Sequence, residues 1–184
     1  STRIRSASFA IEADRMRVLV LDLLTLARID ANRGISPETF DVNQALNTLL
    51  DEGAPGMPAE LQRHLAAHPL PVRADPASLA TIVRNLLINA NKYAPGAVQQ
   101  WSTTDEGSRV RIDVHDDGPG IPAADLPHVF ERFYRGEKTR AREEGGSGLG
   151  LSIVQGLARS NGGEVAINSA EGAGTTVTVW LPRG

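Results

Sequence analysis

The chain has 184 residues, 41% of them hydrophobic and 22% charged, with a formal net charge of -3. At this length the chain fits one ordinary domain, or one domain plus a helical appendage, and the hydrophobic fraction is enough for a core. The small acidic excess argues against a general nucleic-acid-binding protein. Absence of cysteine excludes disulfides and thiolate metal sites and is compatible with a reducing cytoplasm. No apolar run approaches the roughly 20 residues of a membrane-spanning helix, and the first residues lack the apolar block of a signal peptide.

Residues 3–31 contain neither glycine nor proline and repeat apolar residues at three-and-four spacing, which predicts one long amphipathic helix. At 1.5 Å per residue it would extend for about 45 Å. Its apolar stripe needs a covering partner, either the chain's own domain or a second helix in a dimeric bundle. The length, and the break at Asn32-Arg33-Gly34, favour the bundle. We therefore divide the chain into a helical part, 1–33, and a domain, 34–184.

The remainder mixes helices and strands without a regular strand-helix-strand rhythm, which predicts an α+β fold, a two-layer sandwich of helices on a sheet. Asp75-Pro76 is a typical helix start, with proline at the first helical position. A loop is expected over 52–58. The expected strands cover 40–42, 61–65, 70–72, 98–103, 110–116, 165–169 and 175–181. The expected helices cover 42–50, 77–93, 125–133 and 149–160.

The helix over 77–93 carries Asn85, Asn89 and Lys92 at spacings that place them on one face. Asparagine oxygens are neutral hard ligands suited to Mg²⁺, and a lysine one turn away can meet a phosphate as a point charge. The competing interpretation is an ordinary polar surface stripe, which taken alone is the commoner case.

The strand over 110–116 runs directly into Asp116-x-Gly118-x-Gly120. A carboxylate at a strand end can accept a hydrogen bond from an exocyclic amine such as that of adenine. Glycines allow a flat ring to approach the backbone closely. A plain surface turn has the same composition, so this motif by itself leaves both interpretations open.

The glycine-rich stretch Gly146-x-Gly148-Leu149-Gly150 opens a helix, where free backbone N–H groups form an anion site suited to phosphates. It is neither a P-loop nor a dinucleotide-binding glycine motif, because the spacings differ and no Gly-Lys pair occurs. A flexible hinge is the alternative. The preceding residues 136–144 are rich in charge and poor in apolar side chains, which predicts a lid over bound ligand.

In this order the motifs resemble the catalytic ATP-binding domain of sensor histidine kinases. That domain shares its Bergerat-type fold with type II topoisomerases, MutL and heat-shock chaperone ATPases. The asparagine box, first glycine box, phenylalanine box, second glycine box and closing hairpin of this family resemble residues 85–93, 116–120, 130–135, 146–151 and 172–176.

The resemblance implies ATP and Mg²⁺ as cofactors, with Asn89 binding the metal and Asn85 alongside. Asp116 would hold the adenine amino group, and Lys92 and Arg135 would contact phosphates. The implied catalytic residues are Asn85, Asn89, Lys92 and Arg135. The implied nucleotide-binding residues are Asn89, Lys92, Tyr93, Asp116, Gly118, Gly120, Gly146, Gly148, Leu149, Gly150 and Thr175.

Hydrolysing relatives place a glutamate base where this chain has Asn85, and asparagine cannot take a proton at neutral pH. This favours phosphoryl transfer to a histidine. None of the four histidines fits the acceptor motif, and His64 with Pro69 reproduces only its spacing. The acceptor is therefore expected on a bundle helix of a longer parent chain. Residues 3–31 resemble the second helix of that bundle.

We expect the chain to be the catalytic fragment of a histidine kinase and to lie in the cytoplasm. The full-length kinase would be a homodimer, and its phosphoryl group would pass to the receiver domain of a response regulator. Membrane attachment would come only through a part N-terminal to this chain. The alternatives are a serine-directed switch kinase or ATPase of the same superfamily, and a non-enzymatic nucleotide sensor or scaffold. A purely structural domain would require every motif to be coincidental.

Overall fold

The computed structural model describes residues 2–31, 33–53, 60–136 and 146–184. The chain divides into two compact units, Ser1–Gly34 and Ile35–Gly184. The first unit contains a single helix, α1 (Thr2–Asp30), which confirms the helix predicted from the absence of glycine and proline. Gly34 follows it with a positive φ of 78°. Within the described residues, no helix is both long and apolar enough to span a bilayer.

The second unit is built around a five-stranded sheet whose strands lie in the order β2-β4-β5-β7-β6. β2 pairs with β4 in parallel, and every other neighbouring pair in this sheet is antiparallel. A separate two-stranded sheet pairs β1 with β3. The strands are β1 (Glu38–Asp41), β2 (Glu60–His64), β3 (Pro71–Ala74), β4 (Val98–Asp105), β5 (Arg109–Asp116), β6 (Glu164–Ser169) and β7 (Thr175–Pro182).

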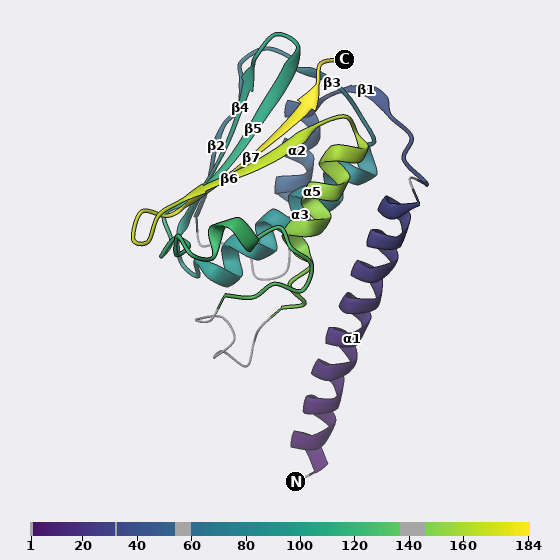
Figure 1. The fold of residues 1–184 in the computed structure, drawn as a ribbon, viewed down its shortest axis with the longest axis vertical. Helices are drawn as coiled ribbons and strands as arrows, with labels where there is room; N and C mark the ends of the chain where they lie inside the picture. The colour runs from purple at the N-terminus through teal and green to yellow at the C-terminus, as the bar shows by residue number, and fades with distance from the viewer. Residues whose placement is uncertain (1, 32, 54–59, 137–145) are drawn as a thin grey trace. The chain divides into compact units, whose positions relative to one another are not determined.

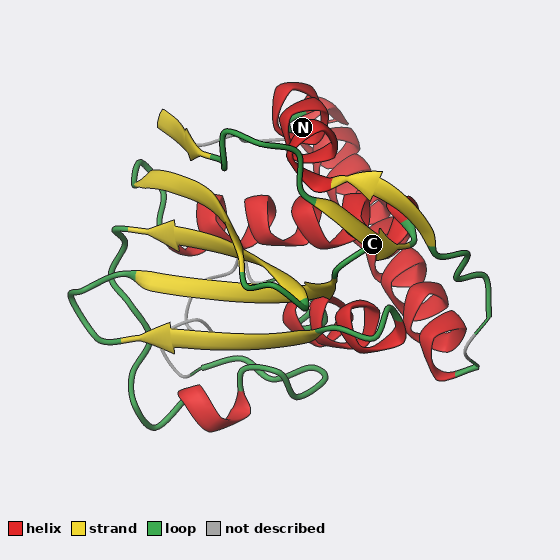
Figure 2. Ribbon diagram, turned by 90° about the horizontal axis from the view of Figure 1, so that it is seen from above, coloured by secondary structure: helices red, strands yellow, loops and turns green. Residues whose placement is uncertain are grey.

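One face of the five-stranded sheet is covered by helices, as Figures 1 and 2 show, which makes the predicted two-layer α+β sandwich. The helices are α2 (Val42–Glu52), α3 (Pro76–Tyr93) and α5 (Gly150–Ser160). Alternate residues of the central strands point into this layer, so Trp101 on β4 and Ile112 on β5 are almost completely buried. The sandwich core is therefore the space between one sheet face and these helices.

Local signals fix where the helices begin. The Asp75 carboxylate accepts a hydrogen bond from the Ser78 N–H at 2.8 Å, and Pro76 takes the first helical position of α3. Asp41 caps α2 in the same way and also accepts from the Leu70 N–H, which connects α2 to the start of β3. Both helix starts thus follow from the sequence.

Other expectations need correction. The helix predicted over 125–133 is wrong: only one 3-10 turn, η1 (Leu126–His128), forms there. Pro127 lacks a backbone N–H, and Phe133 has φ +65°, which an α-helix cannot contain. The strand expected at 40–42 ends at Asp41, and Val42 is instead the first residue of α2. Residues 54–58 of the expected loop and 137–144 of the expected lid lie outside the described residues.

Candidate functional site

Three polar side chains lie side by side at one end of the sheet. Asp116 is the last residue of β5, and its register partners are Thr175 on β7 and Gln99 on β4. The Asp116 carboxylate accepts a hydrogen bond from the Gly118 N–H at 3.1 Å. Burial raises the pKa of the Asp116 carboxyl, and the hydrogen bond from Gly118 opposes that rise. A carboxylate held in this way is desolvated and still has acceptor capacity.

The turn after β5 requires its glycine at position 120. Gly120 has φ +70°, and a Cβ there would overlap the Ala170 carbonyl oxygen. On the other side of the contact, Gly174 has φ +77°, and a Cβ there would overlap the Asp116 carbonyl oxygen. The turn between β6 and β7 is therefore packed backbone-to-backbone against the end of β5, which fixes where Asp116 lies.

The predicted face of α3 points at the glycine-rich stretch before α5. A Cβ on Gly150 would lie 3.0 Å from Asn85 Oδ1 and 3.4 Å from Asn89 Oδ1, and one on Gly146 would collide with the Lys92 ammonium. The three α3 side chains thus share one face. Asn85 also donates from its amide nitrogen to the Thr81 carbonyl at 2.9 Å, which leaves its oxygen toward Gly150.

The glycine-rich stretch is bound to the segment that carries Arg135. The Phe133 N–H donates to the Gly148 carbonyl at 3.0 Å. Gly148 has φ +73°, and a Cβ there would lie 2.8 Å from the Tyr134 carbonyl oxygen. Leu149 is fully buried and anchors the start of α5. This packing brings the phenylalanine-box segment and the N-terminus of α5 to the same site.

A cavity of about 640 Å³ opens between these elements, with α3 and the end of β5 among its walls. Among the described residues, the predicted site residues that line it are Asn89, Lys92, Tyr93, Asp116, Gly120, Arg135 and Thr175. The predicted residues outside its lining are Asn85, Gly118, Gly146, Gly148, Leu149 and Gly150. Of these, Gly150 faces Asn85 and Asn89, and Gly118 packs against Ala94.

Sequence reasoning missed the apolar walls of this cavity. Val114, Val177 and Ile167 occupy neighbouring register positions on β5, β7 and β6, so they form a row across the sheet. Leu86 and Ala90 face the cavity from α3, one turn apart. Same-face spacing along each strand and helix was the signal that could have found them. The result is a polar rim over an apolar wall.

Asp125 and Tyr134 are two further lining residues that the sequence did not indicate. The Tyr134 hydroxyl donates to Asp125 Oδ1 at 2.7 Å, and the His128 ring lies 5.3 Å from the Tyr134 ring. A Cβ on Gly136 would collide with the Asp125 carboxylate. These contacts hold the segment after η1 in place where it carries Arg135.

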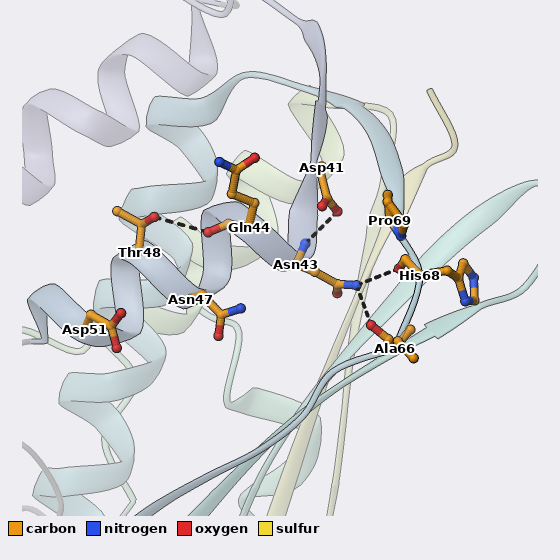
Figure 3. A pocket seen from close by; sticks show the side chains of 10 residues that line it. Asp41, Asn43, Gln44, Asn47, Thr48, Asp51, Ala66, His68 and Pro69 are labelled. Carbon is orange, nitrogen blue, oxygen red and sulfur yellow. Dashed lines mark hydrogen bonds between the residues drawn. The ribbon is translucent and has the colours of Figure 1, made fainter.

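A second pocket, of about 390 Å³, is seen in Figure 3 and contains none of the predicted site residues. It lies where α2 meets the connection between β2 and β3. Its central side chain, Asn43, donates to the carbonyls of Ala66 and His68, both at 3.0 Å, and accepts from the Thr103 hydroxyl at 2.7 Å. These bonds hold the fold together, so we assign the pocket a structural role.

The Asn89 amide oxygen in the lining of the large cavity, with the Asn85 oxygen just outside that lining, fits a magnesium ion that is shared with phosphates. Within the described part of the chain, no group of three or more His, Cys, Asp or Glu side chains could hold a metal ion. Mg²⁺ usually keeps several waters and phosphate oxygens and takes one or two protein oxygens. The Asn85 and Asn89 amide oxygens, side by side opposite Gly150, match that limited requirement.

Comparison with known proteins agrees with the two-layer α+β fold. Residues 74–184 match the family described as histidine kinase-, DNA gyrase B-, and HSP90-like ATPase. The probable sensor histidine kinase TcrY of Mycobacterium tuberculosis is 36% identical over 175 residues, covering 94% of this chain and 37% of TcrY. Sensor histidine kinase WalK of Bacillus subtilis is 36% identical over 177 residues, covering 93% of this chain and 29% of WalK.

Among solved structures, full-length ShkA in complex with AMPPNP matches with a TM-score of 0.80 and 25% identity, covering 99% of this chain and 39% of ShkA. The chain thus spans about a third of the length of the relatives it matches. The two-layer α+β sandwich, with its cavity between α3 and the end of β5, and the family match define the chain as a domain of the ATPase class. The chain belongs to the histidine kinase-, DNA gyrase B- and HSP90-like ATPase family.

Proposed function

We propose that this chain is the ATP-binding part of a sensor histidine kinase, which binds Mg·ATP and transfers its γ-phosphoryl group to a histidine. One observation carries the proposal. Asp116 at the end of β5 and the Asn89 and Lys92 side chains of α3 line a single cavity, and a glycine-rich helix start faces α3. Segments that are distant in the sequence thus bring to one site a group that binds the base (Asp116), a metal ligand (Asn89) and a phosphate contact (Lys92).

The adenine base occupies the apolar part of this cavity in the proposal. Asp116 accepts a hydrogen bond from the exocyclic amine, which needs the ionised carboxylate, and Val114 and Ile167 pack against the ring. Gly120 lets the ring approach the backbone, since no side chain stands there. Asp116 therefore determines that the base is adenine.

The phosphates lie toward the N-terminus of α5. Lys92 and Arg135 line the cavity and supply positive charge, and the free N–H groups at the start of α5 supply further donors. Asn89 holds the magnesium ion with Asn85 beside it, and the bound ion contributes neutralisation of phosphate charge. Catalysis then consists mainly of positioning, because phosphoryl transfer needs little covalent help from protein groups.

Transfer rather than hydrolysis is proposed because the described residues include no carboxylate base at the position that hydrolysing relatives use. Asn85 stands where hydrolysing relatives have a glutamate, and its amide nitrogen is already engaged with the Thr81 carbonyl. In the transfer, a histidine nitrogen forms a bond to the γ-phosphorus, the bond to the bridging oxygen breaks, and ADP leaves. The four histidines of this chain do not fit the acceptor motif, so another segment supplies that group.

The whole-protein context is part of the same proposal. α1 acts as the second helix of a dimerisation bundle, whose first helix carries the acceptor histidine in a homodimeric parent kinase. The phosphoryl group then passes to an aspartate of a response-regulator receiver domain on the cytoplasmic side of a membrane. The sensor histidine kinases that match this chain over more than nine-tenths of its length support this context.

Calorimetric titration of a Mg·ATP analogue into the wild-type chain and its Asp116→Asn variant tests the proposal. We expect micromolar binding by the wild type and a roughly 10- to 150-fold loss in the variant, because a hydrogen bond to a charged group contributes about 1.5–3 kcal/mol. The matched control is Asp117→Asn, whose carboxylate accepts from the Val98 N–H outside the cavity lining. Equal affinities in all three proteins would contradict the assignment of Asp116.

A phosphotransfer assay with an added histidine-bearing bundle tests the kinase step separately. The chain should transfer phosphate from ATP to the bundle histidine, and Asn89→Ala should remove that transfer. Tight nucleotide binding without transfer would instead support the scaffold or nucleotide-sensor function.

A further inference from the structure

Gln99 is a buried polar residue that the proposed function does not use. It is 1% exposed, on the face of β4 that points into the sandwich, beside Trp101. The Trp101 indole N–H donates to Gln99 Oε1 at 3.4 Å. Because the indole is a donor only, this contact fixes which end of the amide is oxygen. Among the described residues, Gln99 Nε2 has no hydrogen-bond partner.

An unpartnered buried donor is costly, so such groups nearly always have a partner or a function. Gln99 is the direct register partner of Asp116, on the same face of the sheet. Side chains at such positions have their Cβ atoms about 5 Å apart. The Gln99 side chain therefore starts beside that of Asp116, the carboxylate that the proposed function uses to read adenine.

The chemistry of the pair is complementary. Burial raises the pKa of the Asp116 carboxyl because its ionised form loses solvation, and backbone hydrogen bonds from Gly118 and Thr175 oppose that rise. Gln99 offers an N–H of the kind that favours the ionised form. A buried water between an amide N–H and a carboxylate satisfies both groups and is common in protein interiors.

We propose that Gln99 is a positioning residue for base selection: through a buried water it holds the Asp116 carboxylate ionised and oriented toward the exocyclic amine of adenine. This inference rests on the proposed adenine-reading function of Asp116. Gln99 is not among the residues that line the cavity, so in the proposal it acts through Asp116 and not by contact with the nucleotide. Substitution of Gln99 should therefore change the preference between purine bases more than it changes the binding of the phosphates.

The test compares Mg·ADP with the Mg²⁺ complex of purine riboside diphosphate, which lacks the 6-amino group, by calorimetry. In Gln99→Leu we expect ADP affinity to fall about fivefold, and affinity for the amine-free nucleotide to change less than twofold. The matched control is Gln100→Leu, on the opposite face of the same strand, which should leave both affinities unchanged. Gln99→Met, close in length to glutamine and without a donor, should repeat the Leu result if the Leu variant is poorly folded.

The outcomes distinguish a failure of the inference about Gln99 from a failure of the adenine-reading function proposed for Asp116. If the wild type prefers ADP and Gln99→Leu keeps that full preference, the inference about Gln99 is overturned while Asp116 retains its assignment. Equal weakening of both nucleotides would show a structural role only and also overturns it. If the wild type binds both nucleotides equally well, adenine reading by Asp116 fails, and the role of Gln99 fails with it.

Discussion

Acidic residues near the two ends of β5 differ in their hydrogen-bond partners and in the direction of their pKa shifts. At the cavity end, Asp116 is half-buried, has acceptor capacity left, and has a pKa raised by burial. At the hairpin end, Glu106 accepts from Arg109 Nε at 2.8 Å and from the Trp180 indole N–H at 3.1 Å. The Arg109 guanidinium lowers the pKa of Glu106.

Under the proposed function, the difference separates a group that binds the ligand from groups that stabilise the fold. The hairpin end satisfies its charges internally, and the Arg109 guanidinium also lies 4.7 Å above the Trp180 ring. At the cavity end, burial of the Asp116 carboxylate outweighs its backbone hydrogen bonds, which costs folding free energy that a bound donor would offset. The pKa of Asp116 is thus raised and that of Glu106 lowered, in agreement with the proposal that the cavity end binds the ligand.

The largest expected effect comes from the glycines at the two ends. Gly120 and Gly107 both have positive φ, of 70° and 80°, but only Gly120 has backbone where a Cβ would go. We expect Gly107→Ala to lower the free energy of unfolding by about 1–2 kcal/mol, the cost of the left-handed backbone. Gly120→Ala should cost roughly 3 kcal/mol or more, because the Ala170 carbonyl must also move.

Urea denaturation of the two alanine variants measures that difference, since each serves as the control for the other. Equal destabilisation would mean that the turn between β6 and β7 does not press on the end of β5 in solution.

A smaller effect is expected when the Asp116 charge is removed. Because the folded pKa is raised, the ionised form opposes folding, and this cost grows as pH rises from the unfolded value of about 3.9 through the folded value. Asp116→Asn should therefore raise the Tm of the nucleotide-free protein at pH 7. The gain should shrink as pH falls toward that unfolded value.

Thermal denaturation at a series of pH values provides this comparison, with Asp117→Asn as the neighbouring control. A lower Tm for Asp116→Asn at pH 7 would indicate that the carboxylate is satisfied in the free protein, and the contrast between the two ends would disappear.

The smallest effect is expected for Glu106→Gln at the hairpin end. A lowered pKa means that the ionised carboxylate stabilises the fold above the unfolded value of about 4.3, and that this contribution is lost as pH falls through the folded value. The variant should show a slightly lower Tm at pH 7 and a difference that vanishes in acid. A Tm above that of the wild type would contradict the assignment of Glu106 to the fold.

Local patterns predicted much of the fold and part of the site. Alternation of apolar residues identified β5, and Asp75-Pro76 identified the start of α3. Helical spacing placed Asn85, Asn89 and Lys92 on one face of α3, and in the structure this face lies against the glycine-rich stretch. Each of these depends on residues close in sequence, where periodicity is informative.

What the sequence did not predict depends on contacts between distant segments. The parallel pairing of β2 with β4 is one example, and the alignment of Gln99 with Asp116 is another, since both require the strand order. The predicted helix over 125–133 failed for a related reason. Phe133 adopts positive φ where its N–H reaches the Gly148 carbonyl, a bond that spacing in one segment does not reveal.

The bond between Phe133 and Gly148 couples two segments through the main chain alone. Its donor and acceptor are backbone groups, so the bond does not depend on which side chain stands at position 133. Substitutions at 133 that keep the backbone conformation should therefore preserve this junction, whereas proline, which has no N–H, would remove the bond.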